Sequence, residues 1–286
     1  MGAAALLAAL SGFGVAETTR TPVMRTAALA LRDWPQGAPP IRVALLSDIH
    51  AGNRAMTPAR LTRIVAQVNA AHPDLVLLAG DFLIGAAEAD PGRYAAALLA
   101  PLAALHAPLG TIAALGNHDH WAGTAQVTAA LKQHGVTVLE NAAVRRGPLT
   151  ILSVGDAFTG HDDVAAALRS AQGLGGARVV VTHGPDLVHK LPPELGLLLA
   201  GHTHCGQIVL PGMGPLFRKS PQRGWHRIYD PHYRCGIVRD GAVGKEAGKG
   251  GRTTVITGGL GSGSVPIRIG APPDFWVLTL GPGPTP

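Results

Sequence analysis

Five short apolar runs of this 286-residue chain are each followed by residues that can bind a metal ion. In chain order these residues are Asp48, His50, Asp81, Asn117, His183, His202 and His204. Imidazole and carboxylate groups without thiolate suit Mn, Fe, Zn or Co better than they suit a structural zinc site. Seven donors are more than one ion needs, so the pattern predicts two divalent metal ions that share a carboxylate.

A pair of divalent ions predicts chemistry at phosphorus. Two ions about 3.5–4 Å apart hold a phosphoryl group for in-line attack and lower the pKa of bound water. They carry more positive charge than Asp48 and Asp81 offset, so the site attracts a phosphate oxyanion. We therefore expect a dinuclear metal-dependent hydrolase of phosphate ester or pyrophosphate bonds, with a metal-bridging hydroxide as the nucleophile.

Each motif alone has an ordinary structural explanation. The Asp-x-His segment at 48–50 is typical of a solvated turn, and the Gly-Asp pair at 80–81 is typical of a turn or a helix N-cap. A single histidine such as His183 is usually a surface or core imidazole. Their conjunction favours the metal site, because five unrelated turns have no reason to share these residue types.

The apolar runs read as strands that alternate with helices. Strands are predicted at 41–46, 74–79, 111–115, 136–139, 149–154, 178–182, 197–200, 207–210, 253–257 and 275–280. Helices are predicted at 57–71, 91–105, 124–134 and 163–171. This order predicts an α/β fold with a mixed sheet or a sandwich. Ligands of such sheets bind at the carboxyl ends of the strands, where we expect the seven residues to meet.

Residues 211–251 are rich in Gly, Pro, Arg and His and have no clear periodicity, which predicts an irregular excursion rather than a second domain. Its basic residues either meet substrate phosphates or anionic lipid or form a solvated loop: Arg218, Lys219, Arg223, Arg227 and Arg234. Residues 258–264 read as a flexible turn near the metals, because they lack the lysine of a phosphate-binding P-loop. His120, Trp121 and Arg268 are candidates to line the pocket or to serve the fold.

Composition narrows the class of protein. A hydrophobic content of 47% with 15% charged residues excludes a disordered chain. The net charge of +6 suits anionic partners. Aromatic residues make up only 4% and no dense Lys/Arg block is present, so a nucleic acid partner is disfavoured. Two cysteines exclude a disulfide-rich scaffold. Cys205 and Cys235 could pair in an oxidising compartment, but we favour two unpaired thiols.

Residues 1–20 form an apolar N-terminal segment with three interpretations. Residues 1–15 are nearly all apolar or small, but a membrane-spanning helix needs about 20 apolar residues. No Lys or Arg precedes the apolar stretch, as a secretory signal requires. The segment therefore reads as the end of a truncated membrane anchor, as a degenerate export signal, or as a loose apolar arm, and we favour the first two.

The order Asp-x-His, Gly-Asp, Gly-Asn-His-Asp, His and Gly-His-Thr-His resembles that of the calcineurin-like metallophosphoesterases, from about Ile41 to Leu280. The resemblance implies a four-layer α/β/β/α sandwich in a domain at 41–282. It also implies a first ion on Asp48, His50 and His204, a second on Asn117, His183 and His202, and Asp81 as the bridge. By the same resemblance His118 is the general acid, and Asp119 orients its imidazole.

The stretches 206–211 and 258–268 resemble a bacterial membrane-associated or exported branch of that family. Some of its members cleave the pyrophosphate of UDP-2,3-diacylglucosamine in lipid A synthesis. This implies a phosphorylated small-molecule or lipid-linked substrate and an anionic membrane surface. It places the chain at the bacterial inner membrane or its periplasmic side, with the cytoplasm as the alternative.

Two departures from the branch bear on its substrate. Cys205 replaces an expected glycine, and the segment Arg218–Lys249 is longer and more basic than usual. Two other functions fit the family, namely a nuclease and a non-catalytic scaffold. They are less favoured, because aromatic residues are few and every ligand of the pattern is retained.

Overall fold

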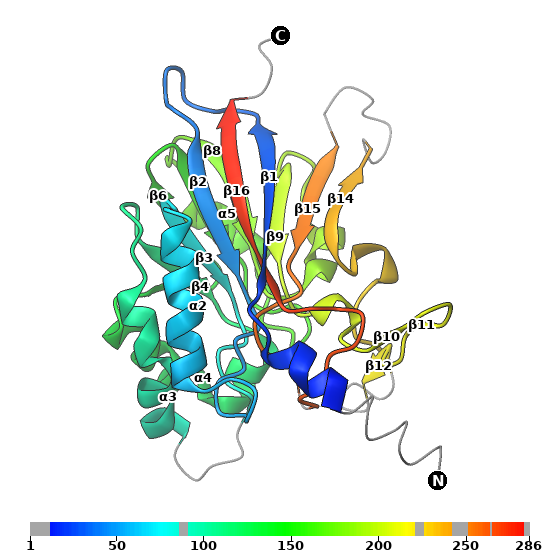
Figure 1. Cartoon of the computed structure of the whole chain (residues 1–286). Helices are drawn as coiled ribbons and strands as arrows, with labels where there is room; N and C mark the ends of the chain where they lie inside the picture. The colour runs from blue at the N-terminus through cyan, green and yellow to red at the C-terminus, as the bar shows by residue number, and fades with distance from the viewer. Residues whose placement is uncertain (1–11, 86–90, 221–225, 242–250, 264, 283–286) are drawn as a thin grey trace, which may run out of the picture.

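The computed structural model of the chain consists of two facing β-sheets with helices on their outer surfaces (Figure 1). It describes residues 12–85, 91–220, 226–241, 251–263 and 265–282. Arg223, Lys249 and residues 1–11 of the apolar N-terminal segment lie outside these ranges. Residues 12–19 are helical. None of the helices in the described ranges is both long and apolar enough to cross a membrane.

The first sheet has six strands in the spatial order β1-β16-β2-β3-β4-β5. Their bounds are β1 Val23–Leu31, β16 Asp274–Pro282, β2 Ile41–Leu46, β3 Leu75–Ala79, β4 Thr111–Ala114 and β5 Thr137–Val138. All neighbouring strands run parallel except β16 and β2, which run antiparallel. The sheet is therefore mixed, with β2, β3 and β4 sharing one direction.

The second sheet has the order β14-β15-β9-β8-β7-β6. Its strands are β14 Gly236–Asp240, β15 Arg252–Ile256, β9 Leu197–Ala200, β8 Ala177–Val181, β7 Leu149–Ser153 and β6 Ala142–Arg146. The two edge strands run antiparallel to their neighbours and the inner four run parallel. In both sheets a block of parallel strands thus delivers its carboxyl ends to one edge.

Helices cover both outer faces. On the first sheet lie α2 Pro58–Ala70, α3 Pro91–Leu99, η1 Ala100–Ala104 and α4 Asn117–Gln133, and on the second lie α5 Val164–Ser170 and η2 Pro185–Lys190. Helix α2 starts at Pro58 because Thr57 caps it by accepting from the Arg60 amide. Helix α4 is kinked at Gly123, whose φ is +110°.

Short elements complete the chain beyond β9. They are η3 His204–Gly206, β10 Val209–Leu210, β11 Gly214–Pro215, β12 Lys219–Ser220, β13 His226–Arg227 and η5 Pro231–Tyr233. The pairs β10–β11 and β12–β13 form two small antiparallel ribbons. The predicted irregular excursion is thus built of short ribbons, and its last strand, β14, joins the second sheet.

The apolar side chains form three clusters that separate the layers. The middle cluster joins the inner faces of the sheets, with Val43, Leu77 and Ile112 of the first sheet and Ile151, Val179 and Leu199 of the second. The other two clusters lie between each sheet and its helices. Helix, sheet, sheet and helix therefore stack in four layers, which confirms the predicted α/β/β/α sandwich.

In the two large sheets the structure adds three strands to the prediction. β1 pairs with β16 although it precedes the predicted domain at 41–282, and β6 and β14 form the edges of the second sheet. All three are only partly buried, and β1 alternates between exposed and half-buried positions along most of its length. Edge strands of this kind lack the continuous apolar run by which the inner strands are recognised.

Candidate metal centre

The seven predicted ligands converge at the carboxyl ends of five strands. Asp48 and His50 follow β2, Asp81 follows β3, and Asn117 follows β4 in the first sheet. The second sheet contributes His183 after β8, together with His202 and His204 after β9. All seven residues are buried. The sandwich therefore brings together every residue that the sequence pattern singled out.

Glycines allow the strand ends to approach so closely. Gly80 has a φ of +82°, and a Cβ atom there would lie 2.6 Å from the amide nitrogen of Gly116. A Cβ atom on Gly201 would lie 2.6 Å from Oδ2 of Asp48. Side chains at these positions would push β3 away from β4, and β9 away from β2.

The ligand loops also hold left-handed backbone at residues other than glycine. The φ angles of Asp48, His50, Asp81, His202 and His204 lie between +48° and +69°. Each such residue costs on the order of 1 kcal/mol, and conformations of this kind concentrate at functional sites. These backbone conformations reduce the stability of the loops, and they turn the side chains toward the centre of the site.

The first group of donors consists of Asp48, His50 and His204, whose ligating atoms all lie within 4.8 Å of one another. His50 Nε2 is 3.1 Å from His204 Nε2, and His204 Nε2 is 3.3 Å from Asp48 Oδ1. Oδ2 of Asp81 is 3.6 Å from His50 Nε2. These atoms surround one point, as the ligands of a single cation do.

The second group consists of Asp81, His183 and His202. His183 Nε2 is 3.1 Å from Oδ2 of Asp81 and 3.0 Å from His202 Nδ1. The other ring nitrogens are engaged elsewhere, His183 Nδ1 with the Ala79 carbonyl at 2.7 Å and His202 Nε2 with the Ile228 carbonyl at 3.2 Å. Backbone carbonyls thus fix which nitrogen of each ring faces the centre.

Unpaired buried oxygens show that this donor set fits metal ions. Among the described residues, Oδ1 of Asp48 and Oδ1 of Asn117 are buried and have no hydrogen-bond partner. A buried polar oxygen without a partner is costly, and a cation satisfies it. The donors are oxygen and imidazole nitrogen, a combination that suits divalent transition metals.

The pKa values of the two aspartates are shifted in the direction that suits cation binding. Burial raises the pKa of Asp48, but the imidazoles of His204, His50 and His183 hold it well below its usual value. Burial likewise raises the pKa of Asp81, yet His183 and its neighbours lower it on balance. Both carboxylates are therefore ionised at neutral pH.

The imidazoles divide into two types. Burial lowers the pKa of His204 and of His202, so both rings are neutral, as ligands must be. Burial also acts on His183, but the carboxylate of Asp81 outweighs it and raises the pKa well above its usual value. His183 would have to give up the proton that it shares with Asp81 in order to hold a cation in the second group.

His118 and Asp119 begin helix α4 beside the first group. The His118 amide donates to Oδ1 of Asp81 at 2.9 Å, and its Nδ1 contacts the Ile84 carbonyl at 2.5 Å. Asp119 accepts from backbone amides, including those of Asp81 and Gly116 at 2.8 and 2.9 Å. These contacts do not support the prediction that Asp119 orients the His118 imidazole, because Asp119 instead holds together the loops after β3 and β4.

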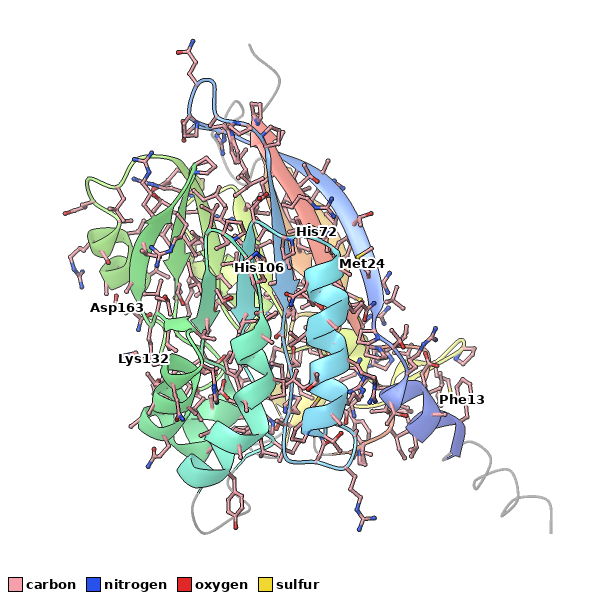
Figure 2. The ribbon with its side chains drawn as sticks, turned by 60° about the vertical axis from the view of Figure 1, so that its left-hand side comes forward. Phe13, Met24, His72, His106, Lys132 and Asp163 are labelled. Atoms are coloured by element: carbon pink, nitrogen blue, oxygen red, sulfur yellow. A yellow bond between two sulfur atoms is a disulfide. The ribbon has the colours of Figure 1, made fainter. Side chains whose placement is uncertain are left out.

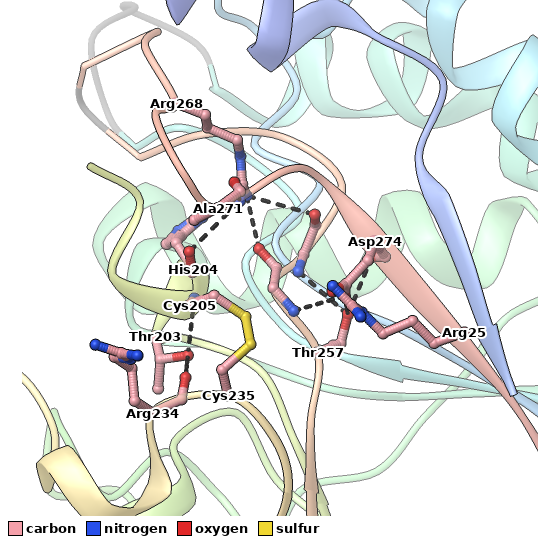
Figure 3. Close-up of a disulfide and its surroundings, with 12 residues drawn as sticks. Arg25, Thr203, His204, Cys205, Arg234, Cys235, Thr257, Arg268, Ala271 and Asp274 are labelled. Carbon is pink, nitrogen blue, oxygen red and sulfur yellow. Dashed lines mark hydrogen bonds and ion pairs between the residues drawn. A yellow bond between two sulfur atoms is a disulfide. The ribbon is translucent and has the colours of Figure 1, made fainter. Parts of the chain in front are cut away.

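Arg268 supports the first group from behind. Its side chain is fully buried, and its N–H groups donate to the carbonyls of Gly258, Gly261 and Ala271 at 2.6, 2.8 and 3.0 Å. Its Nη2 lies 2.9 Å from Nδ1 of His204 (Figure 3). Burial lowers the pKa of Arg268 to about 10, so it remains charged at neutral pH. Residues 258–261 of the predicted turn are thus tied to the ring of a predicted ligand.

A disulfide joins Cys205 to Cys235, with their Cα atoms 4.8 Å apart (Figure 3). The prediction of two unpaired thiols is therefore wrong. The pairing depends on the path of the segment after β13, which runs back to the loop that carries His202 and His204. In this segment the Arg234 carbonyl accepts a hydrogen bond from the Thr203 hydroxyl. Cys205 has a φ of +53°, the left-handed conformation for which glycine is the usual choice.

A cavity of about 130 Å³ opens onto the two donor groups. It is lined by Asp81, Asn117, His118, Trp121, Phe158, His202, His204, Ser220, Ile228 and Gly263. Trp121 therefore lines the pocket, as the sequence allowed, whereas His120 lies outside this lining and stacks on His161 with ring centroids 3.7 Å apart.

Sequence reasoning missed Phe158, Ser220 and Ile228. Phe158 follows the Gly-Asp pair at 155–156 after β7, the same type of strand end that identified Asp81, so a signal was available. Ser220 ends β12 and Ile228 follows β13, in a segment whose sequence has no periodic signal.

The fold and this centre define an α/β metallohydrolase whose donors come from strand ends. Residues 41–206 match the calcineurin-like phosphoesterase family model, and the chain belongs to that family. It is a metallophosphoesterase, and the resemblance seen in the sequence is confirmed at the level of the family.

Two bacterial relatives match nearly the whole chain. The phosphodiesterase YaeI of Escherichia coli is 31% identical over 285 residues, which cover 97% of this chain and 96% of that protein. The uncharacterized metallophosphoesterase YkuE of Bacillus subtilis is 27% identical over 97% of this chain and 93% of its own. The solved 5'-nucleotidase precursor of Thermus thermophilus aligns with a TM-score of 0.48 and 16% identity, over 78% of this chain and 49% of that one.

Replacing Arg268 tests whether it supports the metal centre or only the fold. We expect Arg268→Met to lower the free energy of unfolding by about 2–4 kcal/mol, because it leaves buried carbonyls unpaired. We also expect Mn²⁺ affinity to fall at least about tenfold, because the turn at Gly258 and Gly261, next to His204, loses the side chain that holds it in place. Urea unfolding and calorimetric Mn²⁺ titration measure the two effects.

Arg60→Met is the matched control. Arg60 is also buried, and it donates to the carbonyls of Thr18, Arg20 and Ala55 at 2.9, 3.2 and 3.1 Å, away from the ligands. It should destabilise the fold to a similar degree and leave Mn²⁺ affinity unchanged. Equal losses of Mn²⁺ affinity in both variants would show that Arg268 acts only through stability.

Proposed function

We propose that the chain is a dinuclear metal-dependent phosphodiesterase or pyrophosphatase. The observation that carries this proposal is the position of Oδ2 of Asp81, at 3.6 Å from His50 Nε2 and 3.1 Å from His183 Nε2. One carboxylate oxygen thus lies between two groups of ligands. This is the arrangement that allows an aspartate to bridge two cations.

Each of the seven predicted ligands has a place in one of two cation sites or between them. Asp48, His50 and His204 hold the first cation, Asn117, His183 and His202 hold the second, and Asp81 bridges. Mn, Fe and Zn all suit these donors. When bound, the two cations supply a nucleophile by acidifying water and stabilise charge on the phosphoryl oxygens.

His118 acts as the general acid. Its backbone amide is fixed on Asp81 and its Nδ1 on the Ile84 carbonyl, so Nε2 is the nitrogen left for the substrate. Burial lowers the pKa of His118, which makes its proton easier to transfer, while a phosphoryl anion beside the ring favours the protonated form. The imidazolium then donates its proton to the leaving oxygen.

Several substrates fit this chemistry. A lipid-linked or nucleotide pyrophosphate such as UDP-2,3-diacylglucosamine is one candidate, and a small phosphodiester is another. A nuclease is less favoured because the pocket of about 130 Å³ has no extended basic groove among its lining residues. A non-catalytic scaffold is disfavoured because the ligand set and His118 are all retained.

Asp81→Asn tests the catalytic assignment. The change keeps the shape of the side chain and removes the charge that two cations share, so bound Mn²⁺ should fall from two ions per chain to one or fewer. Hydrolysis of bis(p-nitrophenyl) phosphate by the Mn²⁺-loaded protein should fall at least about a hundredfold. The measurements are metal analysis after gel filtration and initial rates.

Asp163→Asn is the control, because Asp163 is an exposed helix cap whose role asparagine can fill. It should keep both metal content and rate. Full activity of Asp81→Asn, or a wild-type protein that hydrolyses no phosphodiester, monoester or pyrophosphate, would contradict the proposal.

We further propose that the protein binds an anionic membrane surface beside this pocket, as the relative from Danio rerio named "Transmembrane protein with metallophosphoesterase domain" suggests. Exposed apolar side chains, here called the apolar rim, lie on the N-terminal helix, on the segment between β10 and β12, and on the segment between β15 and β16: Phe13, Val15, Met213, Leu216, Phe217 and Val265. The pocket lining includes Ser220 of β12 and Gly263 of the segment between β15 and β16. Figure 1 places the N-terminal helix, β10 and β12 at the end of the molecule to which β2 points. Figure 2 shows Phe13 at the outer edge of that end.

Hydrogen bonds hold these segments together. The Arg268 amide donates to the Gly14 carbonyl at 3.1 Å, and the Leu216 amide donates to the Ile208 carbonyl at 2.9 Å. Arg218 and Lys219 are exposed next to the rim, so cationic groups flank apolar ones, as they do in proteins that lie on anionic lipid. The disulfide further supports an oxidising compartment such as the periplasm.

Vesicle binding tests the apolar rim. The double variant Leu216→Ser/Phe217→Ser should bind phosphatidylglycerol vesicles at least about tenfold more weakly than the wild type, because two apolar contacts with lipid are lost. Co-sedimentation measures the binding. Tyr94→Ser is the control, since Tyr94 is equally exposed but lies on α3. Unchanged binding by the double variant, or equal binding to phosphatidylcholine, would contradict this surface.

A further inference from the structure

We infer that Trp121 and Phe158 form a subsite for the organic group of the substrate, and that this group carries a planar, apolar ring. The inference rests on the proposed function and adds the chemistry of the ester group to it. Both side chains line the cavity that contains the metal donors. We call this pair the aromatic wall.

Trp121 is placed by helix α4. It lies four residues after Asn117 and three after His118, a spacing that puts all three side chains on one face of the helix. The indole and the His118 imidazole meet edge to face, with ring centroids 4.9 Å apart and planes inclined by 64°. Trp121 is 39% exposed. A large apolar ring is thus partly open to solvent directly beside the general acid.

Phe158 extends the same wall from the second sheet. Its ring centroid is 4.8 Å from that of the ligand His202 and 6.4 Å from that of Trp121. Phe158 therefore covers the second donor group, and Trp121 covers His118. A leaving oxygen that receives its proton from His118 has its carbon substituent next to these two rings.

The rest of the lining differs in character. The lining also includes Ser220 of β12, Ile228 after β13 and Gly263 after β15, none of which carries an aromatic ring. The cavity of about 130 Å³ is smaller than the pockets that enclose whole small-molecule ligands. It suits the phosphoryl group, so the organic part must lie across the mouth, where the aromatic wall is.

Ring stacking predicts a measurable preference. Aromatic pairs gain affinity from offset or edge-to-face contact, on the order of threefold to tenfold for one pair. The expected ligand is a phosphoryl group joined to a ring, such as an aryl ester or a nucleotide whose base reaches the wall. Phosphoryl ligands of similar charge that carry an alkyl group instead of a ring gain less affinity from the same surface.

The test compares phenylphosphonate, methylphosphonate and inorganic phosphate as ligands of the Mn²⁺-loaded full chain by calorimetry. The wild type should bind phenylphosphonate roughly five to ten times more tightly than methylphosphonate. Trp121→Ala should reduce this ratio to about one, while the affinity for inorganic phosphate and the metal content stay unchanged. Trp121→Phe should restore part of the ratio.

Tyr94→Ala is the control, because it removes an exposed aromatic ring outside the pocket lining and should leave the ratio unchanged. Three results would overturn the inference: a wild-type ratio near one, an unchanged ratio in Trp121→Ala, or an equal loss of phosphate and phenylphosphonate binding. The ratio is measured without turnover. A wild type that binds these ligands but hydrolyses no phosphoester would therefore contradict the proposed function alone.

Discussion

The whole arrangement depends on one buried carboxylate. Asp81 is 2% exposed, and its Oδ2 faces imidazoles from both sheets, His50 of the first and His183 of the second. The cost of burying this charge is offset by neighbouring imidazoles, that of His183 above all, and by the His118 amide. The donors around it form two groups, so two cations, one on each side, would satisfy the carboxylate.

The sandwich brings strand ends of both sheets together around this carboxylate. Parallel strands of both sheets end at the same edge, so loops distant in sequence meet there. Glycines at 80, 116 and 201 let those loops approach within contact distance, and left-handed residues turn the donors inward. The free-energy cost of the left-handed backbone is offset by the large apolar core between the sheets and by contacts such as that of Arg268 with His204.

The inner part of the fold could be predicted from sequence because its signals are local. The strands at 41–46 and 197–200 match β2 and β9, since each is a continuous apolar run between turn residues. All seven predicted donors lie in the two groups or in the adjoining cavity lining, because a strand end fixes where the next residues point. Their roles as ligands stay predictions.

Other features depend on contacts that sequence patterns do not encode. β1 is recognised as a strand only through its pairing with β16, at the far end of the chain. Cys205 meets Cys235 because the ribbons after β9 return to the ligand loop, and no spacing rule predicts that return. Asp119 follows the proposed acid directly, yet helix α4 turns its carboxylate toward the backbone amides of Asp81 and Gly116. Adjacency in sequence is a poor guide to a partner at a helix N-terminus.

Anomalous diffraction from crystals loaded with Mn²⁺ would show whether Asp81 bridges two cations. We expect two peaks about 3.5–4 Å apart, one on each side of the Asp81 carboxylate, with His50 and His204 next to one and His183 and His202 next to the other. A single peak, or two peaks that do not share Asp81, would contradict this bridging role.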